Sequence, residues 1–212
     1  VLMKKRTAAV ICGAIILAAA AAVYVCSVYR DKPAVSPEPV TAQAVLVIDA
    51  GHVGEDGGAV SASGVPESHI NLAIAQKMQL LLAFVGRETI MTREGEEAIY
   101  SPDAQTLREK KVSDLSNRVK LVNDTAGSIL LSIHQNSLPS STVTHGAQVF
   151  WNRQEGAEVL AESVQEILNK TVNTGNEKRT KRIPDSIYLM KHVTAPGILV
   201  ECGFLSNTAE TE

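Results

Sequence analysis

Four ionisable residues stand beside apolar segments of the chain, and their types could together bind a metal ion. His52 comes shortly after one apolar, β-branched run, and His134 ends another. Glu201 closes a third run, and Glu67 begins a helical pattern directly after a glycine-rich loop. Polar groups at the ends of buried strands must find partners, and ligand sites of α/β proteins gather at the carboxyl ends of strands. We therefore expect these residues to form one site.

Two histidines and one glutamate are a common zinc ligand set in hydrolases, with a fourth position left for water. His52, Glu67 and His134 could supply that set. Glu201 would then be a proton acceptor that is not itself a ligand, taking a proton from water and passing it to the leaving amine. The helical His-Glu-x-x-His zinc motif is absent from the sequence. For Glu67 there is an alternative interpretation as a carboxylate favoured at a helix N-terminus.

The hydrophobic pattern predicts strands that alternate with helices. Residues 44–48 form a continuous apolar run, and strands are predicted there and at residues 88–92, 128–134, 146–151, 187–190 and 198–201. Helical spacing predicts helices at residues 67–85, 114–126 and 157–172, whereas residues 94–112 read as polar and irregular. This alternation indicates an α/β fold, with a mixed, mainly parallel sheet of about six strands flanked by helices on both faces.

Residues 1–30 are predicted to be an N-terminal membrane anchor or signal segment. The basic residues Lys4, Lys5 and Arg6 precede an uncharged stretch at 7–29, which at about 23 residues could cross a bilayer as a transmembrane helix. The positive-inside rule would export everything that follows. We expect a cell-membrane protein with its globular domain on the extracytoplasmic side, or a secreted one if the segment is cleaved. A buried core helix fits less well, because it would normally show a polar face.

A proline-rich linker is predicted at residues 31–43, followed by one domain at residues 44–212. Hydrophobic residues make up 45% of the chain and charged residues 20%, as in a globular protein with an added apolar segment. The net charge of -3 argues against nucleic acid as a partner, because such a surface would have to be basic. The basic run at 178–182 is interpreted as a solvated loop. Cys202 is the one cysteine of the domain, which excludes an internal disulfide there.

Several motifs of the domain occur together in one known family. They are VIDAGH at 47–52 with GGA at 57–59, ESHINL at 67–72, SIHQN at 132–136, and PGILVECGFLSN at 196–207. In these motifs the chain resembles the zinc-dependent N-acetylmuramoyl-L-alanine amidases, over about residues 44–212. The resemblance implies that His52, Glu67 and His134 bind Zn²⁺, and that Glu201 is catalytic. It also implies peptidoglycan as the substrate, cut between N-acetylmuramic acid and L-alanine.

The resemblance extends to one subgroup and includes two departures. Residues 114–121 and 181–190 are similar to the sporulation type, which trims spore-cortex peptidoglycan so that muramic δ-lactam can form. Ala50 stands where the family usually has proline, and Val53 where it usually has glycine. Members of the family continue into a final helix beyond the point matching Glu212, so we expect a C-terminal helix to be missing from this chain.

Other functions and other residues keep alternative interpretations. A different zinc hydrolase of the envelope, such as a peptidoglycan peptidase or deacetylase, would share the metal and differ in the bond cut. A membrane-tethered, non-catalytic peptidoglycan binder is the third alternative, and the need for an activating protein partner is left open. For Arg118 a structural ion pair is favoured over a substrate contact, and for His69 a solvated or packed role over metal binding. Asn136 could assist the site or form a turn.

Overall fold

The computed structural model describes residues 44–211. Within this range no helix is both long and apolar enough to cross a membrane. The anchor or signal segment expected at residues 1–30 and the linker expected at 31–43 lie outside the described residues. Both therefore stay predictions.

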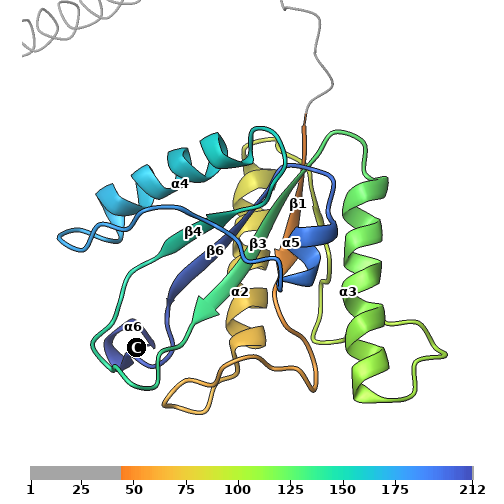
Figure 1. Ribbon diagram of the computed structural model, residues 1–212, viewed down its shortest axis with the longest axis horizontal. Coiled ribbons are helices and arrows are strands. Elements are labelled where there is room, and N and C mark those ends of the chain that lie inside the picture. The colour runs from red at the N-terminus through yellow and green to blue at the C-terminus, as the bar shows by residue number, and fades with distance from the viewer. Residues whose placement is uncertain (1–43, 212) are drawn as a thin grey trace, which may run out of the picture. The chain divides into compact units, whose positions relative to one another are not determined.

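A six-stranded sheet with the order β2-β1-β3-β6-β4-β5 forms the centre of the domain (Figure 1). The strands are β1 Val45–Ala50, β2 Thr89–Met91, β3 Ser128–Asn136, β4 Gln148–Trp151, β5 Lys181–Arg182 and β6 Gly197–Phe204. Neighbours from β2 to β6 run parallel, whereas β4 is antiparallel to β6 and parallel to β5. The prediction of a mixed, mainly parallel sheet is therefore confirmed.

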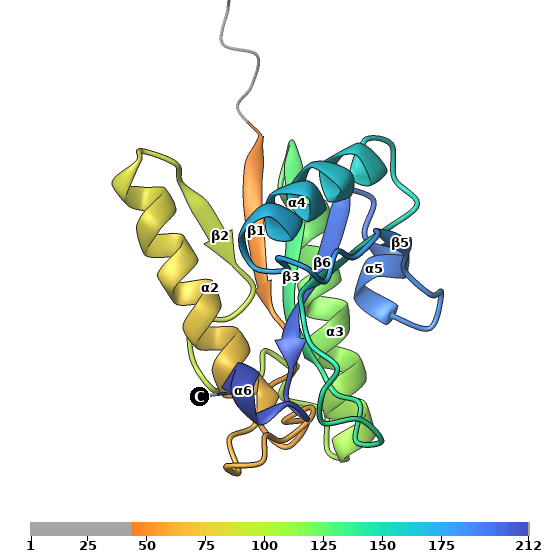
Figure 2. The ribbon, with the colours of Figure 1, turned by 90° about the vertical axis from the view of Figure 1, so that its left-hand side faces the viewer.

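Helices cover both faces of this sheet. They are α2 Glu67–Phe84, α3 Leu107–Asp124, α4 Ala157–Thr171, α5 Tyr188–His192 and α6 Thr208–Thr211. Successive residues of a strand point to opposite faces, so Val47 packs with Val122 of α3 on one face while Ile48 packs with Leu72 of α2 on the other. Figure 2 shows α2 and α3 on opposite sides of β1.

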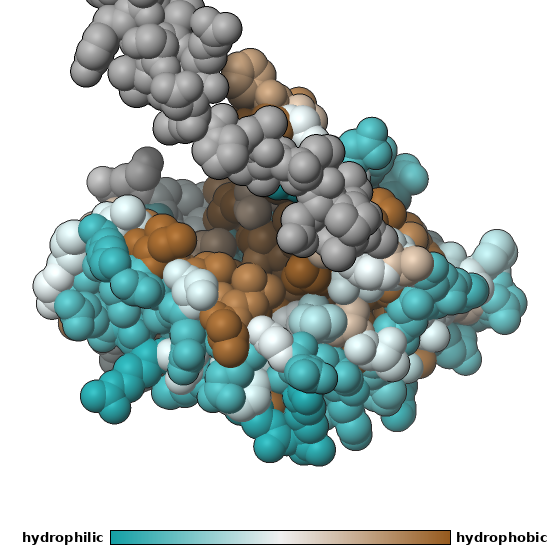
Figure 3. All heavy atoms as spheres, turned by 90° about the horizontal axis from the view of Figure 1, so that it is seen from above, coloured by the Kyte–Doolittle hydropathy of each residue, from teal (hydrophilic) through white to brown (hydrophobic). Residues whose placement is uncertain are grey.

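The C-terminal end of α2 keeps a group of large apolar side chains in solvent. Leu80, Leu81, Phe84 and Val85 are between 66% and 90% exposed. Apolar residues gather on this end of the domain in the view from above (Figure 3). Residues 44–211 therefore leave part of the apolar surface of α2 uncovered.

The predicted strand at 187–190 is wrong, because residues 188–190 belong to the short helix α5 and Ile187 is its N-cap. Leu189 and Met190 are both buried against the face of the sheet that carries α3. In a strand, two consecutive side chains would point to opposite faces. A short apolar run does not distinguish a strand from a buried helix segment by its periodicity.

The limits of two other segments also differ from the prediction. Helix α3 begins at Leu107, within the stretch predicted to be irregular, because Thr106 and Glu109 form a reciprocal capping box at its start. Lys181 and Arg182, predicted to lie in a solvated loop, pair with β4 as the exposed edge strand β5.

A buried ion-pair network joins β1 to α3, to β3 and to the residue that follows β2. Arg118 donates from Nη1 to Asp49 Oδ1 at 2.9 Å and from Nε to Asp114 Oδ2 at 2.8 Å. Thr92 and Ser132 donate their hydroxyls to the two oxygens of Asp49. Burial by itself would raise the pKa of Asp49, but the Arg118 charge and these hydrogen bonds hold that pKa below its ordinary value. The prediction of a structural ion pair for Arg118 is confirmed.

Replacing Arg118 by methionine should destabilise the fold by about 3–5 kcal/mol, because it leaves two buried carboxylates without their cation. Urea unfolding followed by circular dichroism measures this difference. The matched control is Lys120→Met, which breaks a solvent-exposed pair with Asp124 on the same helix. That change should cost less than about 1 kcal/mol, and equal losses for the two variants would contradict the role given to the network.

The stability contributed by Asp49 should depend on pH with a definite sign. Its folded pKa lies below the ordinary value of 3.8, so the unfolded chain takes up a proton first as the pH falls. The contribution should be complete above about pH 5 and should disappear as the pH falls through the folded pKa. Urea titrations between about pH 6 and pH 3 should show a shallower loss for Asp49→Asn than for the unchanged protein. An identical pH slope would exclude this contribution.

Candidate active site

The four predicted site residues line one cleft of about 1050 Å³. His52 follows β1, Glu67 is the first residue of α2, His134 lies on β3 and Glu201 lies on β6. The parallel pairing of β3 with β6 places His134 directly opposite Glu201. Both strands continue beyond these residues, to Asn136 and Phe204, so neither residue ends its strand as predicted.

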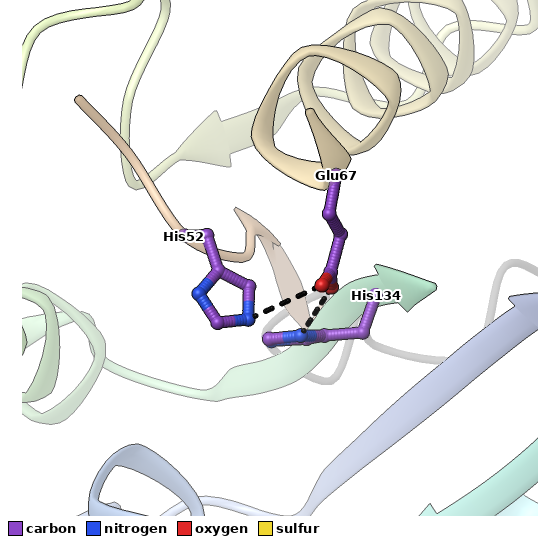
Figure 4. A group of neighbouring side chains, drawn as sticks. All are labelled: His52, Glu67 and His134. Carbon is purple, nitrogen blue, oxygen red and sulfur yellow. Dashed lines mark hydrogen bonds and ion pairs between the residues drawn. The ribbon is translucent and has the colours of Figure 1, made fainter. Parts of the chain in front are cut away.

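His52, Glu67 and His134 converge so that one candidate ligand atom from each lies within 4.8 Å of the others. Figure 4 shows both imidazole rings directed toward the carboxylate. His52 Nε2 lies 3.5 Å from Glu67 Oε2, and His134 Nδ1 lies 3.1 Å from Glu67 Oε1. The fold therefore brings together the three residues expected to bind the metal.

Two glycines make this approach of side chains sterically feasible. A Cβ on Gly51 would lie 2.2 Å from Nε2 of His134, and one on Gly58 would lie 2.4 Å from Oε2 of Glu67. His52 itself has a φ of 56°, an uncommon left-handed conformation for a residue with a side chain. The backbone around the cluster thus has little space for any side chains other than the three that converge.

Glu67 is held as an ionised carboxylate by partners from two other segments and from its own helix. It accepts the backbone N–H groups of Ala59 and Gln135, each at 3.0 Å, and the side-chain amide of Asn71 at 3.2 Å. Burial would raise its pKa, but the hydrogen bond with His134, the charge of His52 and the two backbone donors lower the pKa to about 2. These backbone donors lie outside α2. A role as a cap of its own helix therefore does not explain why the Glu67 carboxylate is held in its ionised form.

The surroundings of Glu201 shift its pKa in the opposite direction from that of Glu67. Burial raises the pKa of Glu201 to about 7, with the charge of His134 lowering it and that of Glu67 raising it. Its Oε2 is buried and has no hydrogen-bond partner among residues 44–211. A carboxylate with a pKa near neutrality can both accept and return a proton. The unpartnered oxygen is one observation that fits a bound water or substrate at this place.

The other residues considered as candidates are not part of the metal-ligand cluster. His69 is exposed and lies 3.5 Å from Glu96, outside the cluster. Burial raises the pKa of Cys202 to about 11, which makes it a poor nucleophile. Asn136 is the last residue of β3, and its side-chain oxygen accepts the N–H of Ser137.

Asp56 is a neighbour of the site that the sequence motifs do not reveal. Its carboxylate lies 3.4 Å from Nδ1 of His52, on the side of the ring away from Glu67. The spacing of four residues from His52 within a glycine-rich loop was the available signal, but only the folded turn brings the two side chains together.

A mixed α/β sheet that carries a His-Glu-His cluster and a partly buried carboxylate in one cleft is consistent with a metal-dependent hydrolase. The family model described as N-acetylmuramoyl-L-alanine amidase matches residues 46–212. The chain belongs to this family, and it is a peptidoglycan amidase.

Individual relatives agree with this assignment. The germination-specific N-acetylmuramoyl-L-alanine amidase of Bacillus subtilis is 34% identical over 166 residues, covering 78% of this chain and 69% of the relative. The CwlD amidase of Clostridioides difficile, solved in complex with the GerS lipoprotein, superimposes with a TM-score of 0.73 at 34% identity, covering 79% of this chain and 86% of that one. The catalytic domain of CwlV from Bacillus (Paenibacillus) polymyxa gives 0.61 at 29%, covering 78% and 83%.

Gly51→Ala should weaken metal binding by about tenfold or more, because the added methyl group would displace the ring of His134 from the cluster. Competition with a chromophoric chelator measures the affinity. Gly95→Ala is the matched control, since a Cβ there meets no atom within 4 Å. Equal affinities for the two variants would show that the close approach at Gly51 is not needed.

Proposed function

We propose that this amidase is zinc-dependent, with His52, Glu67 and His134 as the metal ligands and Glu201 as the proton carrier. The observation that carries the proposal is the convergence of the three ligand atoms within 4.8 Å, beside a carboxylate whose pKa is about 7. The scissile bond is the amide between the lactyl group of N-acetylmuramic acid and L-alanine.

The donor set favours zinc over harder cations. Two imidazole nitrogens and one carboxylate suit a borderline ion, whereas magnesium and calcium prefer sites made of oxygen ligands. Glu67 is already ionised at neutral pH, as a ligand must be. When bound, zinc supplies a Lewis acid that polarises a carbonyl and makes water more acidic.

Glu201 would move the proton that the reaction transfers. Its carboxylate accepts a proton as a water oxygen attacks the amide carbon, and it then delivers that proton to the nitrogen of L-alanine as the C–N bond breaks. The products are a free lactyl carboxylic acid on the glycan and a stem peptide with a free amino terminus. A group with a pKa near the working pH performs both transfers efficiently.

The substrate and the cellular setting follow from this activity. The cleft has a volume of about 1050 Å³ and is lined in part by Tyr188, which is 36% exposed; we expect it to hold the glycan strand with its stem peptide. We place the domain on the extracytoplasmic side, tethered by residues 1–30 or secreted, because peptidoglycan lies there. Similarity to the germination-specific relative supports a role in spore-cortex remodelling. The complex of the C. difficile relative with a lipoprotein supports an accessory protein partner.

Glu201→Gln should lower the rate of amide hydrolysis by about 10²- to 10⁴-fold, because the amide cannot carry the proton. Metal content should stay unchanged, since Glu201 is not a ligand in this proposal. Glu166→Gln, which removes an exposed carboxylate on α4, is the control and should keep full activity. Unchanged turnover of Glu201→Gln would remove it from the mechanism.

Mass spectrometry of digested peptidoglycan identifies the bond that is cut. Stem peptides beginning with a free L-alanine are expected, and a chelator should abolish their formation until zinc is restored. Cuts within the stem peptide, or loss of acetyl groups, would instead indicate a peptidase or a deacetylase.

A further inference from the structure

His52 contacts two carboxylates through its two ring nitrogens. Nε2 lies 3.5 Å from Oε2 of Glu67, in the cluster, and Nδ1 lies 3.4 Å from Oδ2 of Asp56, on the other side of the ring. Nζ of Lys111, on α3, lies 2.8 Å from the same Asp56 oxygen. A chain of contacts therefore runs from α3 through Asp56 and His52 to the ligand cluster.

A tight turn after β1 directs Asp56 back onto His52. The N–H of Val53 donates to the Asp56 carbonyl at 3.0 Å, and the N–H of Asp56 donates to the Val53 carbonyl at 3.1 Å. Gly54, inside the turn, has a φ of 55°, a conformation that glycine adopts without strain. Val53 is buried at 7% exposure and fixes the turn to the domain. The backbone of this turn thus determines where the Asp56 carboxylate lies.

A neutral imidazole has one N–H and one lone pair, and its hydrogen bonds select which nitrogen carries the proton. A carboxylate that accepts the Nδ1 proton leaves the lone pair of Nε2 free for a metal ion, and it also fixes the plane of the ring. We propose that Asp56 is a positioning residue that selects the Nδ1–H tautomer of His52 and orients its Nε2 toward the metal. Lys111 secures the Asp56 carboxylate from α3. This inference rests on the metal site of the proposed function.

The two contacts of Asp56 differ in their expected weight. Lys111 is 56% exposed and Asp56 is 38% exposed, so their ion pair is a surface pair with a modest effect. Partners that orient a metal-binding histidine typically change metal affinity by about 10- to 100-fold. If Asp56 served only to tie its loop to α3, its removal would change stability and leave metal affinity and the tautomer of His52 as they are.

The first test measures zinc affinity of the full-length protein by competition with a chromophoric chelator. Asp56→Ala should weaken binding by about 10- to 100-fold, and Lys111→Met by no more than about fivefold. Glu55→Ala is the matched control, because it removes a carboxylate from the same turn without touching His52, and its affinity should match the unchanged protein. Equal affinities for Asp56→Ala and Glu55→Ala would overturn the inference.

The second test reads the tautomer directly in the metal-free protein, by ¹⁵N NMR of labelled histidine. His52 should carry its proton on Nδ1, and Asp56→Ala should shift the population toward the Nε2–H form. A proton on Nε2 in the unchanged protein would overturn the inference. These outcomes are distinct from failure of the proposed function, in which the unchanged protein would bind no zinc at all.

Discussion

The site depends on one ionised carboxylate, that of Glu67, which is shared by segments far apart in the chain. Backbone N–H groups from the glycine-rich loop and from β3, an amide from α2 and two imidazoles all meet it. A buried charge is costly unless it is fully paired. The convergence of these donors therefore requires the start of α2 and the ends of β1 and β3 to lie together. A metal ion bound here would replace part of that compensation rather than create it.

Two buried arginines hold the C-terminal end of β1, next to the site, in place. Arg93 and Arg118 both donate to the carbonyl of Ala50, and Arg93 also donates to the carbonyls of Gly51 and Ser68. These bonds hold the backbone immediately before His52, whose φ of 56° needs such support. The alanine at position 50, where the family usually has proline, leaves this arrangement intact because the carbonyl accepts the bonds.

The two carboxylates of the site differ in proton affinity, because the fold gives them different hydrogen-bond partners. Glu67 receives hydrogen bonds at both oxygens, which favour its charged form, and its pKa falls to about 2. Glu201 is partly buried, and its buried Oε2 has no hydrogen-bond partner among residues 44–211; this disfavours its charged form, and its pKa rises to about 7. A separation of this kind allows one carboxylate to serve as ligand and the other as acid and base.

The larger strands and helices and the four candidate site residues could be predicted from the sequence alone, because buried strands and amphipathic helices leave long periodic patterns and the motifs are distinctive. The sequence did not predict α5. Its two buried apolar residues are equally compatible with a strand, and only their packing on one face of the sheet distinguishes the two. The start of α3 depends on a capping box at Thr106, which lies in a polar stretch that had been predicted to be irregular. Tertiary structure alone decided the contact of Asp56 with His52 and the proton affinities of Glu67 and Glu201. Those properties arise from distances, burial and hydrogen bonds between segments that only the folded chain brings into contact.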